Sequence, residues 1–378
     1  MKIGIVAPEF PPEVGGVQTY AFESARALTR LGHEVTVFCQ PHPEGEVQTT
    51  EFRVEPLLTL RRRTDRALPE RFKMDVWHSM NASYVWLALE TAPVFATVHG
   101  NDFLSVYHPV ARLDLRTRLG LPFGSNLDRK LGDWLTRRLL RRSFPRARHV
   151  FANSRFTEQK LIETHPDCAG KTSVASVGIA EDFKHIERPE RAPGPTRLIT
   201  VCRLSEPDKN VHIVLQALAL LKADHAFHYT IVGDGYLAPG LKRLAQELGF
   251  ADRVTFAGFV SKEQLKELLL ASDLFVLTTS TTVHGHEGFG LVYIEANACG
   301  CPTLAARQGG AVEAVREGET GFFVDKITPS SLADAIRRFI RGEVRFDGGV
   351  CRNFALGFSW ENVARHCVEF YNMALGGL

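Results

Sequence analysis

Two glutamates eight residues apart flank a glycine-rich turn in the segment HGHEGFGLVYIEANACG, residues 284–300. Glu287 precedes a Gly-Phe-Gly turn, and Glu295 lies in the apolar run that follows, which predicts a helix from about Gly290. A helix N-terminus offers free N–H groups and the positive end of the helix dipole, which favours a phosphate. Carboxylates bind pairs of hydroxyl groups through charge-assisted hydrogen bonds. The segment therefore favours a ligand with phosphate and sugar over the alternative, a surface loop followed by a solvated helix face.

Three further groups of residues follow apolar strands. Arg203 ends one strand and Lys209 comes six residues later, and two cations suit a diphosphate. Gly15-Gly16 opens a helix without forming GxGxxG, so the turn admits a ligand but lacks the nicotinamide fingerprint. His99, in VHGND, stands where functional residues gather in open α/β sheets. Each group alone also has an ordinary explanation as surface charge, a flexible turn or a structural histidine.

Alternating apolar strands and amphipathic helices predict two doubly wound α/β domains that face each other across a central cleft. The strands are expected at 3–7, 35–39, 75–78, 94–99 and 149–152, then at 198–203, 228–232, 253–256, 274–278, 302–305 and 321–324. In the second half, helices are expected at 211–222, 238–248 and 262–271. The Pro-rich, charged residues 181–196 predict a linker between an N-terminal domain, 1–180, and a C-terminal domain, 197–355. Residues 356–378 predict a terminal amphipathic helix that crosses back to the N-terminal domain.

The composition excludes several classes of protein. The chain has 378 residues and a net charge of +2, so its overall charge indicates no particular partner. No stretch reaches the ~18 apolar residues of a membrane span. The first residues read as a strand and not as a signal peptide, and none of the seven cysteines forms a CxxC pair. We therefore expect a cytoplasmic protein with buried, reduced thiols.

Residues 111–148 are strongly basic, with eleven Lys or Arg against three Asp. Within them, Leu127–Arg142 predicts an amphipathic helix, and such a helix can lie on an anionic membrane. The alternative is a core helix with a solvated basic face. Nucleic acid is disfavoured as a partner because no aromatic side chains interleave with the charge.

Taken together, these motifs resemble the retaining GT-B glycosyltransferases of family 4, over nearly the whole chain. The resemblance rests on PPEVGGVQTY, VHGND, FANS, CRLSEPDKN, IVGDGY, RVTFAGFV, EGFGLVYIEANACGCP, GG at 309–310, GETGFFV and SWENV. It implies a GT-B fold of two Rossmann-like domains, with the nucleotide-sugar donor on the C-terminal domain and the acceptor on the N-terminal one.

The resemblance also implies roles for single residues. Glu295 would hold the ribose hydroxyls, and Glu287 would contact the donor sugar together with the amides of Phe289, Gly290 and Leu291. Arg203 and Lys209 would stabilise the leaving diphosphate, and Gly16 would approach it from the other domain. His99 would lie by the reacting sugar and Val260 near the base. The implied catalytic residues are thus His99, Arg203, Lys209 and Glu287. The chain departs from the family pattern at Cys202, Asn210 and Asn297, none of which replaces a charged residue.

The implied activity is the transfer of a hexose from a UDP- or GDP-sugar to an acceptor hydroxyl, with retention at the anomeric carbon. The product would belong to a lipid-linked or cell-surface glycan such as lipopolysaccharide, capsule or exopolysaccharide. We expect no cofactor and no metal, because the donor is itself a substrate and cations already serve its diphosphate. A polar loop is favoured over a metal site at His284 and His286. The expected partners are the donor, a sugar or lipid-linked acceptor and, through residues 111–148, the inner face of an anionic membrane.

Two alternatives stay open. One is a nucleotide-sugar epimerase of GT-B fold. The other is a non-catalytic regulator that binds nucleotide-sugars, against which the intact Arg203, Lys209, Glu287 and Glu295 argue.

Overall fold

The computed structural model describes residues 1–376 except 44, 46, 48, 105–125, 187, 190–193 and 284. The chain forms two compact units. The first unit consists of Met1–Gly178, Val283–Gly288 and Ser359–Leu378, and the second of Ile179–Thr282 and Phe289–Phe358. Both are parallel-sheet α/β units, which confirms the predicted fold class.

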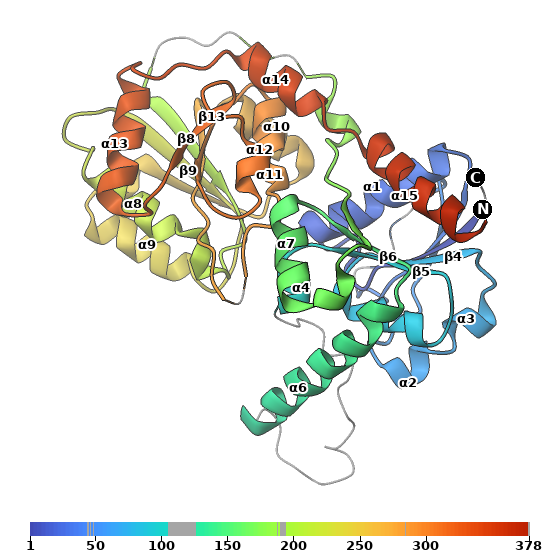
Figure 1. Ribbon diagram of the computed structural model, residues 1–378. Coiled ribbons are helices and arrows are strands. Elements are labelled where there is room, and N and C mark those ends of the chain that lie inside the picture. The colour runs from blue at the N-terminus through green and yellow to red at the C-terminus, as the bar shows by residue number, and fades with distance from the viewer. Residues whose placement is uncertain are drawn as a thin grey trace. The chain divides into compact units, whose positions relative to one another are not determined.

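The first unit is built on a seven-stranded parallel sheet in the order β3-β2-β1-β4-β5-β6-β7 (Figure 1). Its strands are β1 (Lys2–Val6), β2 (Glu34–Phe38), β3 (Arg53–Glu55), β4 (Val76–Ser79), β5 (Val94–Val98), β6 (His149–Ala152) and β7 (Thr172–Val174). The central strands are buried along nearly their whole length, as expected of strands covered on both faces. Ile3, Ile5 and Val6 of β1, for example, are fully buried.

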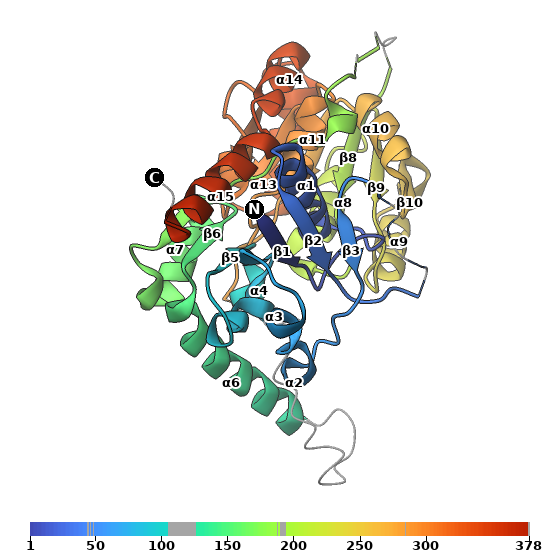
Figure 2. The ribbon, with the colours of Figure 1, turned by 90° about the vertical axis from the view of Figure 1, so that its right-hand side faces the viewer.

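Helices cover this sheet, and the last helix of the chain is one of them. They include α1 (Gly16–Arg30), α2 (Arg62–Asp65), α3 (Leu68–Arg71), α4 (Asn101–Leu104), α6 (Asn126–Ser143), α7 (Arg155–Thr164) and α15 (Trp360–Ala374). α15 packs on α1 (Figure 2). The rings of Tyr20 and Trp360 meet edge to face, with their centroids 5.0 Å apart. Deeper in the unit, the hydroxyl of Tyr371 lies 2.5 Å from Nδ1 of His78 on β4.

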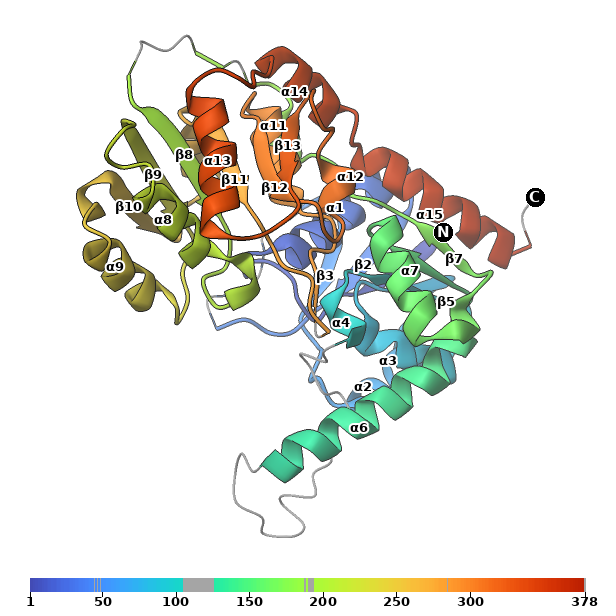
Figure 3. The same ribbon diagram turned by 60° about the vertical axis from the view of Figure 1, so that its left-hand side comes forward.

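The second unit is built on a six-stranded parallel sheet in the order β10-β9-β8-β11-β12-β13. Its strands are β8 (Thr196–Val201), β9 (Phe227–Val232), β10 (Val254–Gly258), β11 (Leu274–Leu277), β12 (Thr303–Ala306) and β13 (Gly321–Val324). Its helices include α8 (Val211–Ala219), α9 (Ala238–Glu247), α10 (Lys262–Leu270), α11 (Leu291–Ala298), α12 (Ala311–Ala314), α13 (Pro329–Ile340) and α14 (Gly348–Leu356). α8 and α13 lie side by side over the sheet and bury Leu215 and Ile336 in its core (Figure 3).

Each sheet has a switch point, where the strand order reverses. In the second unit it lies between β8 and β11, and in the first between β1 and β4. Helices that follow strands on either side of such a point cover opposite faces of the sheet, which opens a crevice at the carboxyl ends of the two strands. Ligands of open α/β sheets bind there.

The structure corrects several predicted boundaries. Predicted 181–196 is not wholly a linker, since it begins with a 3-10 turn at Glu181–Phe183 and Thr196 already belongs to β8. Phe183 is 2% exposed, so its burial orders the start of this segment. The helix expected to reach residue 222 ends at Ala219, and the short strands β3 and β7 were not predicted.

The cysteine prediction is confirmed. All seven cysteines are free, and six are buried while Cys202 is half-buried. Burial raises the pKa of the Cys299 thiol to about 12. No helix among the described residues combines the length and apolar character that crossing a bilayer demands.

Candidate functional site

The N-terminus of α11 has the features expected of an anion site. Gly290 caps the helix in the left-handed conformation, with φ of 87°, which favours glycine, and no side chain caps the first turn. Phe289 is buried against Phe358, with ring centroids 5.4 Å apart, so the turn is held from one side by packing. The N-cap residue of α11 therefore offers no side chain of its own to the N–H groups of the first turn, which begins with Leu291.

Arg203 follows β8, on the other side of the switch point. Its two neighbours are tied to the loop after β9, since the N–H of Cys202 donates to Val232 and that of Leu204 to Asp234, at 3.1 and 2.9 Å. A Cβ atom on Gly233 would collide with the Cys202 carbonyl oxygen, so the glycines of IVGDGY permit this close approach. The Arg203 side chain is exposed. The backbone of Arg203 is thus held at the carboxyl edge of the sheet.

Lys209 ends the 3-10 turn Pro207–Lys209, and its ammonium group lies 3.5 Å from the Glu206 carboxylate. Asn210, the next residue, has a φ of 56°. Asparagine is one of the few side chains that tolerate this left-handed conformation. Asn210 therefore adopts this conformation beside Lys209 with less strain than most other side chains would meet.

Glu295 and Val260 complete the predicted residues of the second unit. Glu295 lies in α11 and is half-buried. Burial raises the pKa of its carboxyl to about 7, and Lys262 at the start of α10 acts in the opposite direction. Val260 is half-buried between the end of β10 and the capping box of Ser261 at α10. The loops and helices that follow the strands of this one sheet thus carry Arg203, Lys209, Val260, the turn at 289–291 and Glu295.

In the first unit, Gly16 begins α1 directly after the loop that follows β1. A Cβ atom placed on Gly16 would meet no protein atom within 4 Å. The protein's own packing therefore does not require glycine here, and the space beside it is open.

His99 follows β5, and its ring is oriented by a backbone carbonyl. Nε2 lies 2.8 Å from the Met80 carbonyl oxygen, which can only accept, so Nε2 carries the proton and Nδ1 the lone pair. Burial lowers the pKa of His99, and the neighbouring Asp102 carboxylate opposes this. Asp102 accepts from the N–H groups of His99 and Ala82, at 2.9 and 2.8 Å, and so joins the loops after β4 and β5. His99 is thus a neutral ring in a fixed orientation.

Glu287 lies in the short segment Val283–Gly288, which groups with the first unit. A Cβ atom on Gly288 would collide with the carbonyl oxygen of His99, so Glu287 is adjacent in sequence to a residue that touches the His99 backbone. The first unit therefore brings Glu287 and His99 to one place. Their side-chain roles stay predictions.

Sequence reasoning missed two residues that hold this segment. The N–H of His286 donates to Oδ1 of Asn101 at 2.9 Å, and Nε2 of His286 lies 3.1 Å from Oγ1 of Thr157. The motif VHGND contains Asn101 and could have indicated it. Nothing in the sequence around Thr157 distinguishes it from an ordinary first-turn threonine of a helix.

No metal centre is found in the described part of the chain, where no group of three or more His, Cys, Asp or Glu side chains could hold an ion. His284 lies outside that part. His286 is buried against protein atoms, with its ring edge to face with Phe156 at 4.9 Å. The partner of its Nε2 is the hydroxyl group of Thr157.

The basic segment 111–148 is described only from residue 126 onward. Arg112, Asp114, Arg116 and Arg118, and the side chains of Asp128, Arg129 and Lys130, lie outside the description. α6 covers Asn126–Ser143 and so contains the predicted helix. Leu139 and Leu140 are buried, whereas Arg137, Arg138, Arg141 and Arg142 are exposed. Trp134 is 54% exposed, with the Arg138 guanidinium 5.4 Å from its ring centroid.

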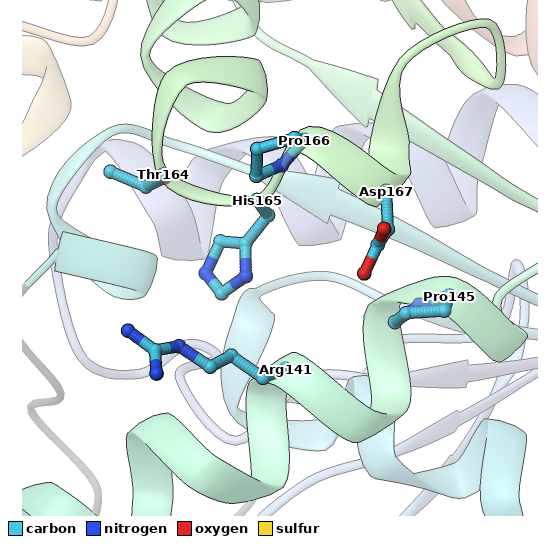
Figure 4. Close-up of a pocket in the computed structure, with 6 residues that line it drawn as sticks. All are labelled: Arg141, Pro145, Thr164, His165, Pro166 and Asp167. Carbon is cyan, nitrogen blue, oxygen red and sulfur yellow. The ribbon is translucent and has the colours of Figure 1, made fainter.

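A cavity of about 260 Å³ lies beside α6, and none of its residues belongs to the predicted site. Its lining comes from the end of α6, the turn after it and the end of α7 (Figure 4): Arg141, Pro145, Thr164, His165, Pro166 and Asp167. Burial lowers the pKa of His165 to about 4, and Arg141 lowers it further. Its ring is therefore neutral at neutral pH.

Known proteins match the chain along almost its whole length. Residues 14–183 match the family model "Glycosyltransferase Family 4", and residues 182–348 match "Glycosyl transferases group 1". A GDP-mannose-dependent alpha-(1-6)-phosphatidylinositol monomannoside mannosyltransferase of Mycobacterium tuberculosis (strain CDC 1551 / Oshkosh) is 27% identical over 98% of this chain and 97% of its own. A D-inositol 3-phosphate glycosyltransferase of Rhodococcus jostii is 26% identical over 96% and 85%.

Solved structures show the same fold. The Anabaena protein Alr3699/HepE in complex with UDP and glucose superposes with a TM-score of 0.72 at 21% identity, over 98% of both chains. The sucrose-phosphate synthase of Thermosynechococcus elongatus superposes with a TM-score of 0.74 at 20% identity, over 99% of both chains. The chain has two Rossmann-like units, and each half of it matches one of these two family models. This chain therefore belongs to the GT-B glycosyltransferases of family 4.

Proposed function

We propose that the chain is a retaining hexosyltransferase that moves a hexose from a UDP- or GDP-sugar to an acceptor hydroxyl. One observation carries the proposal. At the switch point of the second sheet, the loop after β8 supplies Arg203 and Lys209, and β11 on the other side leads to the N-terminus of α11, whose N-cap residue is Gly290. Two cations and a helix N-terminus are the groups that hold a diphosphate.

The relatives favour GDP-mannose as the first donor to test. The Mycobacterium tuberculosis relative is GDP-mannose-dependent by name, and the Anabaena structure contains UDP and glucose. We propose that Glu295 accepts hydrogen bonds from the ribose hydroxyls and Glu287 from hydroxyls of the hexose, while Val260 lies by the base. Carboxylates suit both tasks because each can accept from two hydroxyls at once.

The proposed chemistry breaks the bond between the anomeric carbon and the diphosphate oxygen. The acceptor oxygen attacks the same face, and its proton passes to the departing phosphate oxygen. Arg203, Lys209 and the α11 amides stabilise the charge that develops on the diphosphate, which is the largest contribution a protein makes to such a step. His99 contributes the lone pair of Nδ1, which can accept a hydrogen bond from the donor sugar.

The acceptor is proposed to be a lipid-linked sugar, reached while α6 contacts an anionic membrane surface. The exposed arginines of α6 and the half-exposed Trp134 form a basic, amphipathic face that suits such a surface. The Mycobacterium tuberculosis relative acts on a phosphatidylinositol mannoside by name, which supports a lipid acceptor.

An acceptor-dependence assay tests the proposal. Purified protein is incubated with GDP-mannose or UDP-glucose, with and without phosphatidylinositol mannoside, and with EDTA in a parallel set. We expect release of nucleoside diphosphate only with acceptor, an unchanged rate in EDTA, and an axial or equatorial product linkage that matches the donor. Conversion of the donor sugar without acceptor would indicate the epimerase instead, and loss of activity in EDTA would contradict a metal-free reaction.

A further inference from the structure

The loop that carries Glu287 is anchored by the residue before it. His286 is 4% exposed, and its backbone N–H donates to Oδ1 of Asn101 at 2.9 Å. Its ring packs edge to face on Phe156, and Nε2 lies 3.1 Å from Oγ1 of Thr157. All of these residues belong to the first unit.

The hydrogen bonds around Thr157 determine where the proton of His286 lies. Oγ1 of Thr157 lies 3.3 Å from the carbonyl oxygen of Gly288, which can only accept, so the single hydroxyl proton of Thr157 is directed there. Ser154 donates its hydroxyl proton to Oγ1 of Thr157 at 3.0 Å. The remaining lone pair of Oγ1 then accepts from Nε2–H of His286. The hydroxyl of Thr157 thereby joins the residues on both sides of Glu287.

Glycines bring the loop and its support into close contact. A Cβ atom on Gly100 would lie 2.8 Å from Nε2 of His286, and one on Gly285 would lie 2.5 Å from Oδ1 of Asn101. A Cβ atom on Gly288 would collide with the His99 carbonyl oxygen. The backbone before and after Glu287 therefore packs directly on the rest of the first unit, without room for an intervening water molecule.

His286 is neutral at neutral pH, so its ring supplies no positive charge for binding a phosphate. Burial lowers its pKa to about 4, Glu287 opposes this, and Lys160 of α7 lowers the pKa further. Nδ1 is buried and has no hydrogen-bond partner among the residues that the structure describes. A buried polar atom without a partner costs free energy, so this histidine is not explained by stability alone.

We propose that His286 is a positioning residue whose Nε2–H···Oγ1 hydrogen bond to Thr157 fixes the backbone around Glu287, and thereby aims the Glu287 carboxylate at the sugar of the donor. The inference rests on the proposed function, which assigns Glu287 to that sugar. It predicts that loss of the hydrogen bond between His286 and Thr157 weakens recognition of the hexose and leaves recognition of the nucleotide unchanged.

Three variants of the full-length protein distinguish the effect of losing the hydrogen bond from the effects of side-chain volume and of any substitution in this loop. His286→Leu keeps an apolar side chain of similar volume but lacks the donor. His286→Gln places an amide N–H near the position of Nε2 and so keeps it. Val283→Ser is the matched control, because Val283 lies in the same loop and is 85% exposed.

Calorimetry measures the affinity of each variant for GDP-mannose and GDP, and for UDP-glucose and UDP. For the pair that the wild-type protein binds, His286→Leu is expected to weaken binding of the nucleotide-sugar about tenfold, the cost of one hydrogen bond, while the free nucleotide binds as before. His286→Gln is expected to restore most of the loss, and Val283→Ser to match the wild-type protein. The same pattern is expected in kcat/KM for the donor.

Two outcomes overturn the inference: equal affinities of His286→Leu and the wild-type protein for the nucleotide-sugar, or an equal loss for nucleotide-sugar and nucleotide. If His286→Leu does not fold, Thr157→Val, which removes only the acceptor hydroxyl, is measured in its place with the same expectations. A wild-type protein that binds no nucleotide-sugar contradicts the proposed function itself, and the inference with it.

Discussion

The side-chain amide of Asn210 donates a 2.6 Å hydrogen bond to the carbonyl oxygen of Thr278, and so ties the loop after β8 to the end of β11. The same nitrogen lies 2.8 Å from Oγ of Ser280 and 2.9 Å from the carbonyl oxygen of Asp208. The contacts with Thr278 and Ser280 cross the switch point of the second sheet. Because Lys209 is the residue before Asn210, they also fix the backbone of one of the two proposed diphosphate cations.

Replacing Asn210 with alanine is expected to lower the free energy of unfolding by about 2–3 kcal/mol, since alanine is strained at positive φ and the amide's hydrogen bonds are lost. Asn210→Gly removes the strain but not the loss of hydrogen bonds, so it is expected to fall between alanine and wild type. Urea denaturation measures all three. Asn353→Ala, at an exposed position of α14, is the control. An Asn210→Ala protein as stable as wild type would show that the tie between the loops contributes nothing.

Arg203→Ala and Lys209→Ala are each expected to reduce kcat about 10²–10³-fold, because each removes a cation that stabilises charge on the leaving diphosphate. Steady-state kinetics with saturating donor and acceptor measures this. Lys326→Ala removes an exposed lysine of the same unit and is expected to leave kcat unchanged. If either cation can be removed without loss of kcat, that residue does not act in the transition state.

Glu295 is expected to make stability depend on pH. Burial raises its pKa from the usual 4.5 to about 7, so its contribution to the free energy of unfolding is complete below pH 4.5 and is lost as pH rises through 7. Glu295→Gln is expected to flatten the decline over this interval. Glu247→Gln, on the exposed face of α9, is expected to keep it.

The same carboxyl is expected to release a proton when the nucleotide binds just below pH 7, because ribose hydroxyls donate to its ionised form. Calorimetric titrations in two buffers of different ionisation enthalpy count that proton. Uptake of a proton, or no difference between Glu295→Gln and the wild-type protein, would contradict the ribose-binding role.

Contact between α6 and a membrane predicts binding to anionic vesicles. Reversing Arg138 and Arg142 to glutamate is expected to weaken binding by about 2 kcal/mol or more, roughly thirtyfold, since each basic residue near the surface contributes about 1 kcal/mol. Reversing Arg63 and Arg66, also exposed arginines of the first unit, changes the net charge equally and serves as control. Flotation with phosphatidylglycerol vesicles at low and high salt measures both. Equal binding of the two double variants would indicate attraction by net charge alone.

The fold could be predicted from the sequence because buried parallel strands leave a strong signal. The runs at 149–152 and 321–324 are strands with those same bounds. The three-residue strands β3 and β7 could not be found, because Arg53–Glu55 and Thr172–Val174 are too short for any periodicity and depend on pairing with a neighbour. The burial of Phe183 could not be predicted for a related reason, because it depends on contacts distant in sequence from its Pro-rich surroundings.

Some residues of the candidate site could also be singled out from the sequence. The turn before α11 and the cations after β8 carry their chemistry in residue type, so the sequence could single them out as candidates, and their roles stay predictions. The hydrogen bond between Asn210 and Thr278 and the one between His286 and Thr157 could not be predicted, because each joins residues more than sixty positions apart. In particular, the sequence presents His286 as a polar loop residue, whereas the structure buries it in hydrogen-bond contact with Thr157.

The most direct test of the central claim is a thermal-shift panel of nucleotides and nucleotide-sugars. UDP, GDP, ADP and TDP are compared with their glucose, N-acetylglucosamine, galactose and mannose conjugates. A donor present at 100 times its dissociation constant is expected to stabilise the protein by ~2.7 kcal/mol, and we expect a GDP- or UDP-sugar to do so. Failure of every compound in the panel to raise the unfolding temperature would contradict the assignment of Arg203, Lys209, Glu287 and Glu295 to a nucleotide-sugar donor.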